Sequence, residues 1–436
     1  MTSLPFADHP AHIQAILQAA LNQANPQTAV RQHLQKKGSH LHIGPHRIAL
    51  GDGRLFILSL GKAAVPMALA AVDVVGETAV AGGGIIAKHL PETALPLPAF
   101  IGSHPVPDEK SEAATTAVLE PLAALTEKDT VLCLISGGAS ALFTRPHLPL
   151  AQWQALNRAL LASGCPIQAI NTVRRQLDVV KGGGLARWVA PARIISLILS
   201  DVVGNELAAI GSGPTVASQE TPAEALAVWQ CYHVDRFLDT AVAHAITTTL
   251  QTLAETEFTP PTNIVANLII GSIQQSAQAA AAKAESLGFQ TRLLTTRLEG
   301  EAREVGKFAA ALASDAPSQS ATLLGGETTV TLRGKGKGGR NLETALAAAI
   351  GMAGWSQRTI TSFATDGDDG TSGVAGATVT GQTVKDGETA VTYLDNNDSY
   401  TFFQQLDTAG RGPHLIKTGP TGTNVNDLLL ILNYEM

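Results

Sequence analysis

Short runs of apolar residues recur along the chain without alternating with polar ones. Residues 55–60, 130–135 and 194–199 are examples, and each runs directly into a turn rich in glycine, serine or aspartate. Uninterrupted apolar runs are typical of strands that are buried on both faces, as in a parallel sheet between two layers of helices. Ala-rich, helix-like stretches separate many of these runs. The pattern therefore predicts an α/β fold in which strand, turn and helix repeat.

The repeat is interrupted once, between residues 216 and 261. Two helix-like stretches, 222–231 and 234–256, fill this region, and a Thr-Pro-Pro breaker ends it. Strand-like runs resume directly afterwards. The expected parts are a Rossmann-like domain with a parallel sheet over residues 1–235, a helical linker over 236–262, and a second α/β domain over 263–436.

The second domain is expected to contain a mixed sheet. Residues 328–332 follow so closely on the strand-like run 321–324 that the two are expected to pair as a hairpin. Each domain is thus predicted to be a three-layer α/β/α structure. The strands expected in the second domain are 263–270, 291–295, 321–324, 328–332, 359–364, 414–417 and 428–432.

Composition narrows the possible classes of function. The 436 residues include 30 Lys and Arg against 37 Asp and Glu, a net charge of −7, and 45% of residues are apolar. A chain this apolar is not disordered, and nucleic-acid binding is not expected without a basic excess. We expect no membrane span and no signal peptide, because no apolar run is long enough and the N-terminus lacks a basic start. Three cysteines without metal-site spacing favour a cytoplasmic protein.

The 41 glycines are the feature that leads to candidate chemistry, because a glycine surplus belongs where backbone turns tightly or approaches a ligand. Gly61 and Lys62 follow the strand-like run 55–60, and Ser136, Gly137 and Gly138 follow the run 130–135. Such turns present backbone N–H groups to an anion. A surface lysine at a helix start and a plain strand-to-helix turn are the simpler readings. Arg174 could add a second cation, or could lie at a solvated helix end.

Acidic residues also follow predicted strands. Asp201 and Asp366 each come directly after one, where a carboxylate could hold Mg²⁺ or accept a proton. A helix-capping aspartate and an Asp/Gly surface turn are the alternatives. Glu327 is a third strand-end carboxylate.

The segment 334–341 is a cationic glycine loop that ends in Arg340 and Asn341. It formally satisfies the dinucleotide pattern G-x-G-x-x-G, but no acidic residue stands about 20 positions on to bind a ribose. Its lysines and arginine fit a phosphate chain or a carboxylate better, and a solvated basic loop is the alternative. The chain lacks a P-loop, a nucleophile elbow, a zinc-protease motif and a protein-kinase catalytic loop.

Taken together, these motifs resemble the class II glycerate kinases, the glycerate 2-kinase family with a C-terminal MOFRL domain. The resemblance extends over nearly the whole chain. It implies ATP- and Mg²⁺-dependent phosphorylation of D-glycerate to 2-phosphoglycerate, in a cleft between a Rossmann-like domain and a mixed-sheet domain. The strings that carry it are 61–64, 103–109, 135–138, 171–174, 200–204, 212–215, 325–328, 338–341, 365–367 and 418–425.

The resemblance also suggests roles for residues. Lys62 and Arg340 would neutralise the transferred phosphoryl group or hold the glycerate carboxylate. Either Asp201 or Asp366 would accept the hydroxyl proton, and either could bind Mg²⁺. The residues expected to bind or orient the substrate or the nucleotide are Gly61, Ser136, Gly137, Gly138, Arg174, Glu327, Asn341 and Asn424.

Two other classes of function remain as alternatives. An NAD(P)-dependent hydroxypyruvate reductase would need a dinucleotide site, which the glycine loop does not clearly provide. A non-catalytic binding module would not need the Lys62 and Asp201 side chains, both of which are present. The sequence leaves monomer and homodimer equally open.

Overall fold

The computed structural model describes residues 4–256, 259–385 and 387–435. Contacts divide this part of the chain into two compact units. The N-terminal unit comprises residues 29–199 and 205–270, and the C-terminal unit comprises the rest of the described chain. Each unit is built around its own six-stranded sheet.

The sheet of the N-terminal unit is parallel, with the strand order β6-β5-β4-β7-β8-β9. The edge strand β9 joins β8 through backbone bonds from Ile194 to Asn263 and from Ser200 to Gly271, which advance in the same direction along both strands. The helices and strands are α2 (Pro26–His33), β1 (Leu34–Lys37), β2 (His40–Ile43), β3 (His46–Ala49), β4 (Leu55–Leu60), α3 (Ala64–Val75), β5 (Val80–Ala87), β6 (Ala99–Ile101), α4 (Glu109–Leu119), β7 (Thr130–Ile135), α5 (Ala139–Leu142), α6 (Leu150–Ala162), α7 (Ile167–Gln176), α8 (Gly184–Val189), β8 (Arg193–Leu199), α9 (Pro222–Cys231), α10 (Thr240–Ala254) and β9 (Ile264–Gly271).

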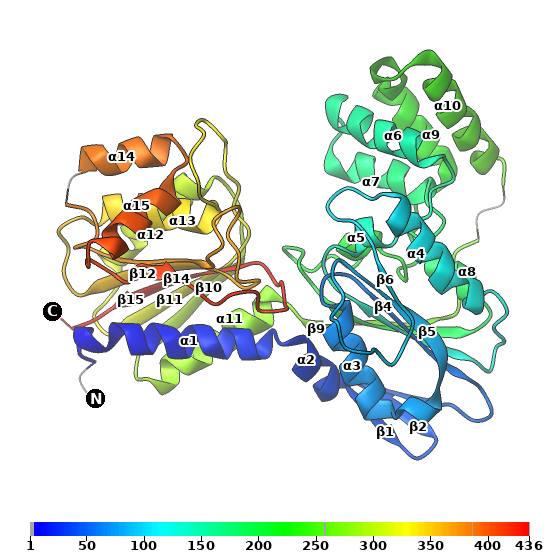
Figure 1. Ribbon diagram of the computed structural model, residues 1–436, viewed down its shortest axis with the longest axis horizontal. Coiled ribbons are helices and arrows are strands. Elements are labelled where there is room, and N and C mark those ends of the chain that lie inside the picture. Colours follow the sequence, from blue (N-terminus) through cyan, green and yellow to red (C-terminus); the bar gives the residue numbers. More distant parts are fainter. Residues whose placement is uncertain (1–3, 257–258, 386, 436) are drawn as a thin grey trace. The chain divides into compact units, whose positions relative to one another are not determined.

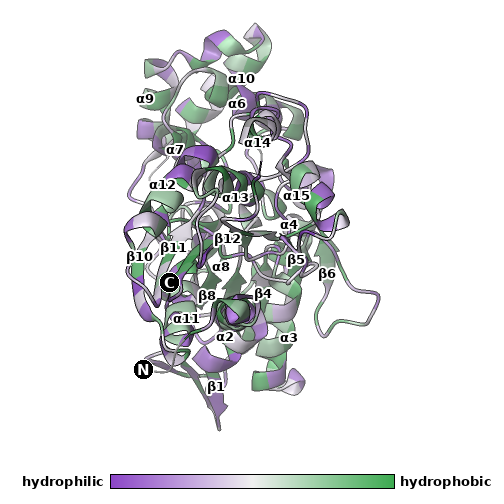
Figure 2. Ribbon diagram, turned by 90° about the vertical axis from the view of Figure 1, so that its left-hand side faces the viewer, coloured by the Kyte–Doolittle hydropathy of each residue, from purple (hydrophilic) through white to green (hydrophobic). Residues whose placement is uncertain are grey.

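The central strands explain why uninterrupted apolar runs in the sequence predicted them. Every residue of β4 and β7 is buried, so these strands carry apolar side chains on both faces. Figure 2 shows β4 and β8 as hydrophobic and β1 as largely hydrophilic. β1, β2 and β3 form a small antiparallel sheet of their own. A separate apolar cluster joins α6, α7, α9 and α10 around Trp153 and Trp229.

The sheet of the C-terminal unit is mixed, with the order β10-β11-β15-β12-β13-β14. Only β10 and β11 pair in parallel, and the other neighbours pair antiparallel. The helices and strands are α1 (His9–Gln23), α11 (Ile273–Ser286), β10 (Gln290–Leu298), α12 (Ala302–Asp315), β11 (Ser320–Gly326), α13 (Arg340–Gly351), β12 (Arg358–Ala364), β13 (Gly376–Thr380), α14 (Gly387–Asp395), α15 (Ser399–Thr408), β14 (Leu415–Ile416) and β15 (Asp427–Asn433).

Helices cover both faces of the mixed sheet. In Figure 1, α1 and α11 lie together on one face, and α12, α13 and α15 lie on the other. Each face has its own apolar core, one with Ile16 of α1 and Leu430 of β15, the other with Leu346 of α13 and Ile431 of β15. Adjacent residues of β15 therefore serve opposite layers, as strand geometry requires. The predicted fold class, a parallel-sheet domain and a mixed-sheet domain with three layers each, is confirmed.

One predicted pairing is wrong. Residues 328–332 form no hairpin with β11; in this segment Thr329 makes a single parallel bridge to Glu301. The antiparallel neighbour of β11 is β15, which comes from the end of the chain. The sheet is mixed as expected, but through a long-range pairing in place of a local turn.

The two units also divide the chain differently from the predicted limits of 1–235, 236–262 and 263–436. Strand β9 completes the N-terminal sheet, because it pairs with β8. Helix α1 belongs to the C-terminal unit, because it packs on α11. The expected linker contains α10, whose Ile246 and Leu250 are fully buried in the apolar cluster of the N-terminal unit. Among the described residues, no helix is long and apolar enough to cross a bilayer.

Candidate functional site

One edge of the mixed sheet gathers several of the predicted site residues. Asp427, the first residue of β15, pairs with both Gly326 at the end of β11 and Ala364 at the end of β12. Glu327 and Thr365 follow these strand ends directly. Polar residues from three distant parts of the sequence therefore meet at this edge.

Arg340, the first residue of α13, is held at that edge by two carboxylates. Its Nε and Nη2 donate to the two oxygens of Asp427, with 3.0 Å between Nη2 and Oδ1. Its Nη1 lies 3.0 Å from Oε1 of Glu327. Burial alone would lower the pKa of Arg340, but its hydrogen bonds to Asp427 and the charges of Asp427 and Glu327 outweigh it and raise the pKa. Arg340 is thus a permanently charged group. Its three contacts with described residues leave two of its five N–H donors for another anion.

A third carboxylate, Asp369, lies beneath Arg340 and holds the start of α13. The backbone N–H groups of Asn341 and Leu342 donate to it at 3.0 and 2.8 Å. The side-chain amide of Asn341 also donates to Asp369, and its oxygen accepts from Ser362. Asn341 is therefore part of the support under Arg340. Burial raises the pKa of Asp369 to about 6, against the opposing effect of these hydrogen bonds.

Asp366 and Asn424 lie on two loops that are bonded to each other. Thr421 donates its backbone N–H to the Asp366 carbonyl (3.2 Å) and its hydroxyl to the Thr365 carbonyl (2.6 Å). The half-buried Asp366 carboxylate accepts from the N–H of Asp368 through Oδ1. Its Oδ2 has no protein partner in the described part of the chain. Asn424 is also half-buried, and its side-chain oxygen accepts from the N–H of Asn426.

Asp201 follows β8 but groups with the C-terminal unit, in the segment Ser200–Gly204. Its neighbour Ser200 donates its N–H to the Gly271 carbonyl (2.8 Å). A side-chain carbon at Gly204 would lie 3.8 Å from the guanidinium carbon of Arg297, near the end of β10. Asp201 is half-buried and interacts with neighbouring groups. The segment thus lies close to a strand whose end belongs to the same sheet edge as Gly326.

In the N-terminal unit, the two predicted glycine turns interlock. Lys62 donates its backbone N–H to the Gly137 carbonyl (2.9 Å), and Ala63 donates its N–H to the hydroxyl of Ser136 (3.0 Å). Gly61 has φ +115°, and a side chain there would overlap Ser136. The side chain of Lys62 is exposed. The backbone N–H groups of Gly137 and Gly138 have no protein acceptor among the described residues, so this turn can donate to an external anion.

His104 lies against the same turn. A side-chain carbon at Gly138 would lie 3.1 Å from His104 Cδ2 and 3.2 Å from Lys62 Cγ, which places both side chains beside this glycine. Burial, and then the charges of Lys62 and Lys88, lower the pKa of His104 to about 4. His104 is therefore neutral at pH 7 next to an exposed lysine.

Arg174 approaches this region from α7. Its Nη2 lies 3.5 Å from the hydroxyl of Ser140, which in turn lies 2.7 Å from the hydroxyl of Ser212. Its Nε is buried and has no hydrogen-bond partner in the structure as described. Burial also lowers the pKa of Arg174. An arginine with an unsatisfied N–H beside two hydroxyls is suited to bind an anion.

Comparison with known proteins relates this arrangement to a family. Residues 12–247 match a domain of unknown function, DUF4147, and residues 320–427 match the MOFRL family. A D-glycerate 2-kinase of Thermotoga maritima is 38% identical over 95% of this chain and 96% of its own length. The chain belongs to the glycerate 2-kinase family. A solved glycerate kinase structure from Thermotoga maritima has the same fold, with a TM-score of 0.82 over 96% of this chain and 97% of that chain at 36% identity.

Another member of this family bears on the reductase alternative. A protein of Agrobacterium vitis, provisionally named a hydroxypyruvate reductase, is 36% identical over 96% of this chain and 93% of its own length. In the present chain, the reason to expect a dinucleotide site was the G-x-G-x-x-G pattern of the loop 334–341. The structure gives the backbone of this loop other partners. The N–H groups of Gly334 and Lys337 donate to Asn397 and Asp398, and that of Gly336 donates to the Asn396 carbonyl. These donors are already used, so they do not cradle a phosphate.

The glycines of that loop have another role. A side chain at Gly334, Gly336 or Gly339 would overlap Asn396, Asp398 or Asp369 respectively. The loop is therefore glycine-rich because two backbone segments run in contact there. Lys337 lies 4.2 Å above the ring of Tyr400, which accounts for one of the two loop lysines.

Sequence reasoning missed the buried pair Lys181–Asp178. Lys181 stands before three consecutive glycines, yet its side chain is only 1% exposed. It lies 3.0 Å from Asp178 and donates to the carbonyls of Ser140 and Phe143 at 2.9 and 3.1 Å. Burial lowers the pKa of Lys181, although Asp178 acts in the opposite direction. This lysine supports the Ser136–Phe143 segment from behind; a cation three residues after an aspartate was the only signal for it.

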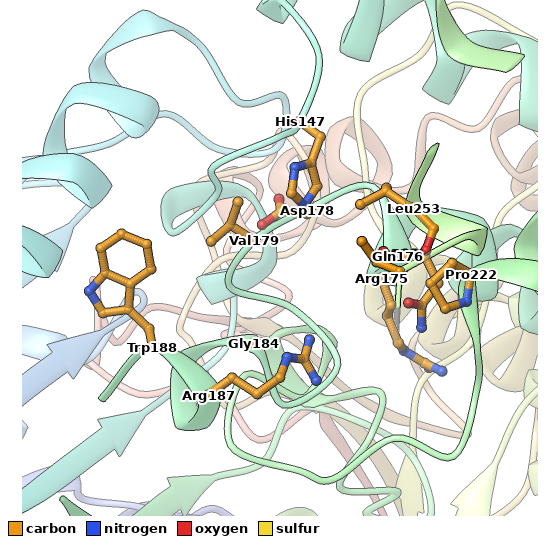
Figure 3. Close-up of a pocket in the computed structure, with 11 residues that line it drawn as sticks. His147, Arg175, Gln176, Asp178, Val179, Gly184, Arg187, Trp188, Pro222 and Leu253 are labelled. Atoms are coloured by element: carbon orange, nitrogen blue, oxygen red, sulfur yellow. Dashed lines mark hydrogen bonds between the residues drawn. The ribbon is translucent and has the colours of Figure 1, made fainter. Parts of the chain in front are cut away.

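A cavity of about 340 Å³ lies near this support, and none of the predicted site residues lines it. Figure 3 shows His147 and Asp178 on one side and the side chains of Arg175 and Arg187 on another. Arg175 is paired with Glu220 at 2.6 Å, and Arg187 donates to the Gly182 carbonyl at 3.2 Å. The consecutive residues Arg174 and Arg175 thus have different contacts: Arg175 pairs with Glu220, and Arg174 reaches the hydroxyl of Ser140.

Proposed function

We propose that this protein transfers the γ-phosphoryl group of ATP to the 2-hydroxyl of D-glycerate, giving 2-phosphoglycerate. One observation carries the proposal: unused donors converge at the Lys62 turn, namely two glycine N–H groups and an exposed ammonium. Phosphoryl transfer needs positioning and charge neutralisation more than covalent chemistry from the protein. The names of the relatives support the same reaction.

The proposal assigns roles to both units. Lys62 and the N–H groups of Gly137 and Gly138 would bind phosphate oxygens, with Arg174 as a further cation. Arg340 would hold the glycerate carboxylate or the transferred group with its two remaining donors, while Glu327 and Asp427 fix its orientation. Gly61 and Ser136 would keep the turn in shape, and Asn341 would support Arg340 through Asp369. Asp201 or Asp366 would accept the proton of the attacking hydroxyl.

The carboxylates fit a magnesium ion that is shared with the nucleotide. Among the described residues, no group of three or more His, Cys, Asp or Glu side chains could hold a metal ion. Mg²⁺ needs fewer protein ligands, because it usually retains waters and binds substrate phosphates with one or two carboxylates. Asp366, with its unpartnered Oδ2, and Asp201 are the residues that would hold it, and Asn424 lies on the loop bonded to Asp366. When bound, the ion would neutralise phosphate charge.

The substrate and cofactor assignments can be tested together. The protein should release ADP with D-glycerate and ATP only when Mg²⁺ is added, and phosphorus NMR should show 2-phosphoglycerate. The reductase alternative predicts loss of NADH absorbance with hydroxypyruvate and no ADP release. Turnover without any divalent cation would contradict the magnesium assignment.

Variants test the residues. Lys62→Met and Asp201→Asn should each lower kcat/KM by at least about 100-fold while the far-UV circular dichroism stays unchanged. Lys37→Met is the matched control, because Lys37 is an exposed lysine of β1 in the same unit, and its activity should match the unmodified protein. Near-normal turnover of Lys62→Met would remove that residue from the site. The free cysteines are compatible with the cytoplasm, where we expect the enzyme to act.

A further inference from the structure

A second, larger cavity lies in the C-terminal unit, and none of the residues assigned to catalysis above lines it. It has a volume of about 730 Å³ and lies between α1 and the segments around β13 and β14. Helix α11 covers β10, β11 and β15, and α1 lies beside α11. The space between α1 and the β13–β14 edge of the sheet therefore remains unfilled.

The cavity is elongated and largely apolar. It is lined along α1 at positions three or four residues apart, including Ile13, Leu17 and Leu21, so one stripe of the helix forms a wall. From His9 to Leu21 this wall is about 18 Å long at the helical rise of 1.5 Å per residue. Phe363 and Ile416 of the sheet lie opposite. An extended hydrocarbon chain fits a groove of this length.

The charges on the cavity wall have one sign. Arg411 and Lys417 carry these charges, the histidines His9 and His414 also line the cavity, and no aspartate or glutamate is among the described lining residues. Asp407, which lies behind His414, accepts from its Nδ1 at 2.8 Å and so fixes the ring. Nε2 of His414 has no protein partner in the described structure. Among the described residues, the guanidinium of Arg411 donates only to the carbonyls of Gln382 and Thr383, so no described carboxylate pairs with it.

We propose that this cavity binds an acyl carboxylate of about 10–14 carbons, with its tail along α1 and its carboxylate among Arg411, His414 and Lys417. The volume lies within the usual range of about 300–1,000 Å³ for ligand pockets, which are apolar with a few oriented polar groups. A neutral hydrocarbon would leave Arg411 and Lys417 without a counter-charge among the described residues. A small anion such as phosphate would leave the apolar walls exposed.

The cavity is connected to the loop that carries Asn424. Thr418 lines the cavity, and its hydroxyl would lie 2.8 Å from a side-chain carbon at Gly367, the neighbour of Asp366. Farther along the same loop, Thr421 bonds to the Asp366 carbonyl. Thr423 donates its hydroxyl to the carbonyl of Ala24, at the end of α1 (2.7 Å). Both walls of the cavity therefore end at contacts of this loop. A ligand bound in the cavity should change the kinetics of the kinase, an expectation that rests on the proposed function.

Binding is tested first, by titration calorimetry with dodecanoate, dodecan-1-ol and inorganic phosphate. Dodecanoate should bind saturably with one site per chain, more tightly than dodecanol, and phosphate should not compete. The double variant Arg411→Gln/Lys417→Gln should weaken dodecanoate binding at least tenfold and change dodecanol binding less than twofold. Gln14→Trp, which places a ring into the cavity from an exposed position, should abolish binding of both. Ala11→Trp, on the same helix but outside the lining, should leave it unchanged.

Several outcomes would overturn the proposal. Absence of saturable dodecanoate binding, or equal effects of the charge variants on both ligands, removes the carboxylate site. If Gln14→Trp dissociates a dimer in sedimentation and dodecanoate does not bind, the cavity is an interface between two copies. For the coupling, dodecanoate should change KM or kcat at least twofold, with half of the effect at its own Kd. Binding of dodecanoate without any kinetic effect overturns the coupling alone. Because calorimetry does not depend on turnover, failure of the kinase assignment can be distinguished from failure of the proposed binding site.

Discussion

Arg340 and Asp427 form a two-point ion pair between the start of α13 and the start of β15, 87 residues apart in the chain. The Arg340 side chain is 30% exposed and the Asp427 side chain 11%. Removal of the arginine would therefore leave a nearly buried carboxylate without its main partner, which is more costly than the loss of a surface pair.

We expect Arg340→Met to lower the free energy of unfolding by about 2–3 kcal/mol, somewhat less than a fully buried pair because Arg340 is partly exposed. The double variant Arg340→Met/Asp427→Leu should recover part of this loss, because no unpaired charge remains. Urea unfolding curves of Arg340→Met, Asp427→Leu and the double variant measure the coupling between the two residues. Strictly additive losses in the two substitutions would show that the pair does not stabilise the fold.

Asp369 should make stability depend on pH. Burial raises its pKa to about 6 in the folded protein, above the ordinary value of 3.8. Between these two pH values the Asp369 carboxyl binds more protons in the folded state than in the unfolded state. The contribution of Asp369 to the free energy of unfolding is therefore greatest below about pH 4 and falls as the pH rises through 6. The effect amounts to about 2–3 kcal/mol, at 1.4 kcal/mol per pKa unit.

The measurement is the difference in unfolding free energy between the unmodified protein and Asp369→Asn from pH 4 to pH 7. Asparagine cannot titrate, so the advantage of the unmodified protein should shrink as the pH rises. The comparison also cancels the contributions of other acids, such as Asp129, whose pKa is lowered mainly by its hydrogen bond with Arg54. A difference that is constant across this range would contradict the raised pKa.

Much of the fold could be predicted because buried strands leave a plain signal. The runs 55–60 and 130–135 match β4 and β7 exactly. Strand β5 was missed because its centre is Gly82, Gly83 and Gly84, residues that are rare in strands. Those glycines are required by contacts from elsewhere in the sheet, since a side chain at Gly83 would overlap Ile57. The sequence of β5 alone does not contain that information.

The candidate site likewise contains residues that local sequence predicts and residues that depend on distant contacts. Lys62, Glu327, Arg340 and Asp366 could be proposed because each follows or flanks a glycine turn. Asp427, the second carboxylate partner of Arg340, could not be predicted. It lies beside Arg340 because β15, near the end of the chain, inserts between β11 and β12. Buried support from distant segments depends on tertiary pairing, which has no local signature.

Lys62 should control the ionisation of His104. After burial, the charge of Lys62 is the largest cause of the lowered pKa of His104, about 4. Lys62→Met should therefore raise this pKa towards the ordinary value of 6.5, whereas Lys88→Met should raise it less. NMR titration of the His104 ring protons measures both shifts. An unchanged pKa in Lys62→Met would mean that the two side chains do not lie together at Gly138.

The same turn yields a test that separates backbone strain from function. Gly138 and Gly164 have similar positive φ angles, +81° and +75°, but nothing lies within 4 Å of a side-chain carbon at Gly164, whereas Lys62 and His104 lie close to one at Gly138. Alanine at either position should cost about 1–2 kcal/mol of stability, because both would adopt a left-handed conformation.

Only Gly138→Ala should also impair phosphoryl transfer, because its methyl group would displace Lys62 and crowd the free N–H groups of the turn. The contacts at Gly138 require Lys62 to shift by a few tenths of an ångström, and since a misplacement of about 1 Å can cost about 100-fold in rate, we expect kcat to fall by roughly 10-fold. Thermal unfolding and steady-state kinetics with D-glycerate and ATP measure the two effects separately for each variant. If both variants lose stability equally and both keep full activity, the Ser136–Gly138 turn does not bind the transferred phosphate, and the role of Lys62 must be assigned elsewhere.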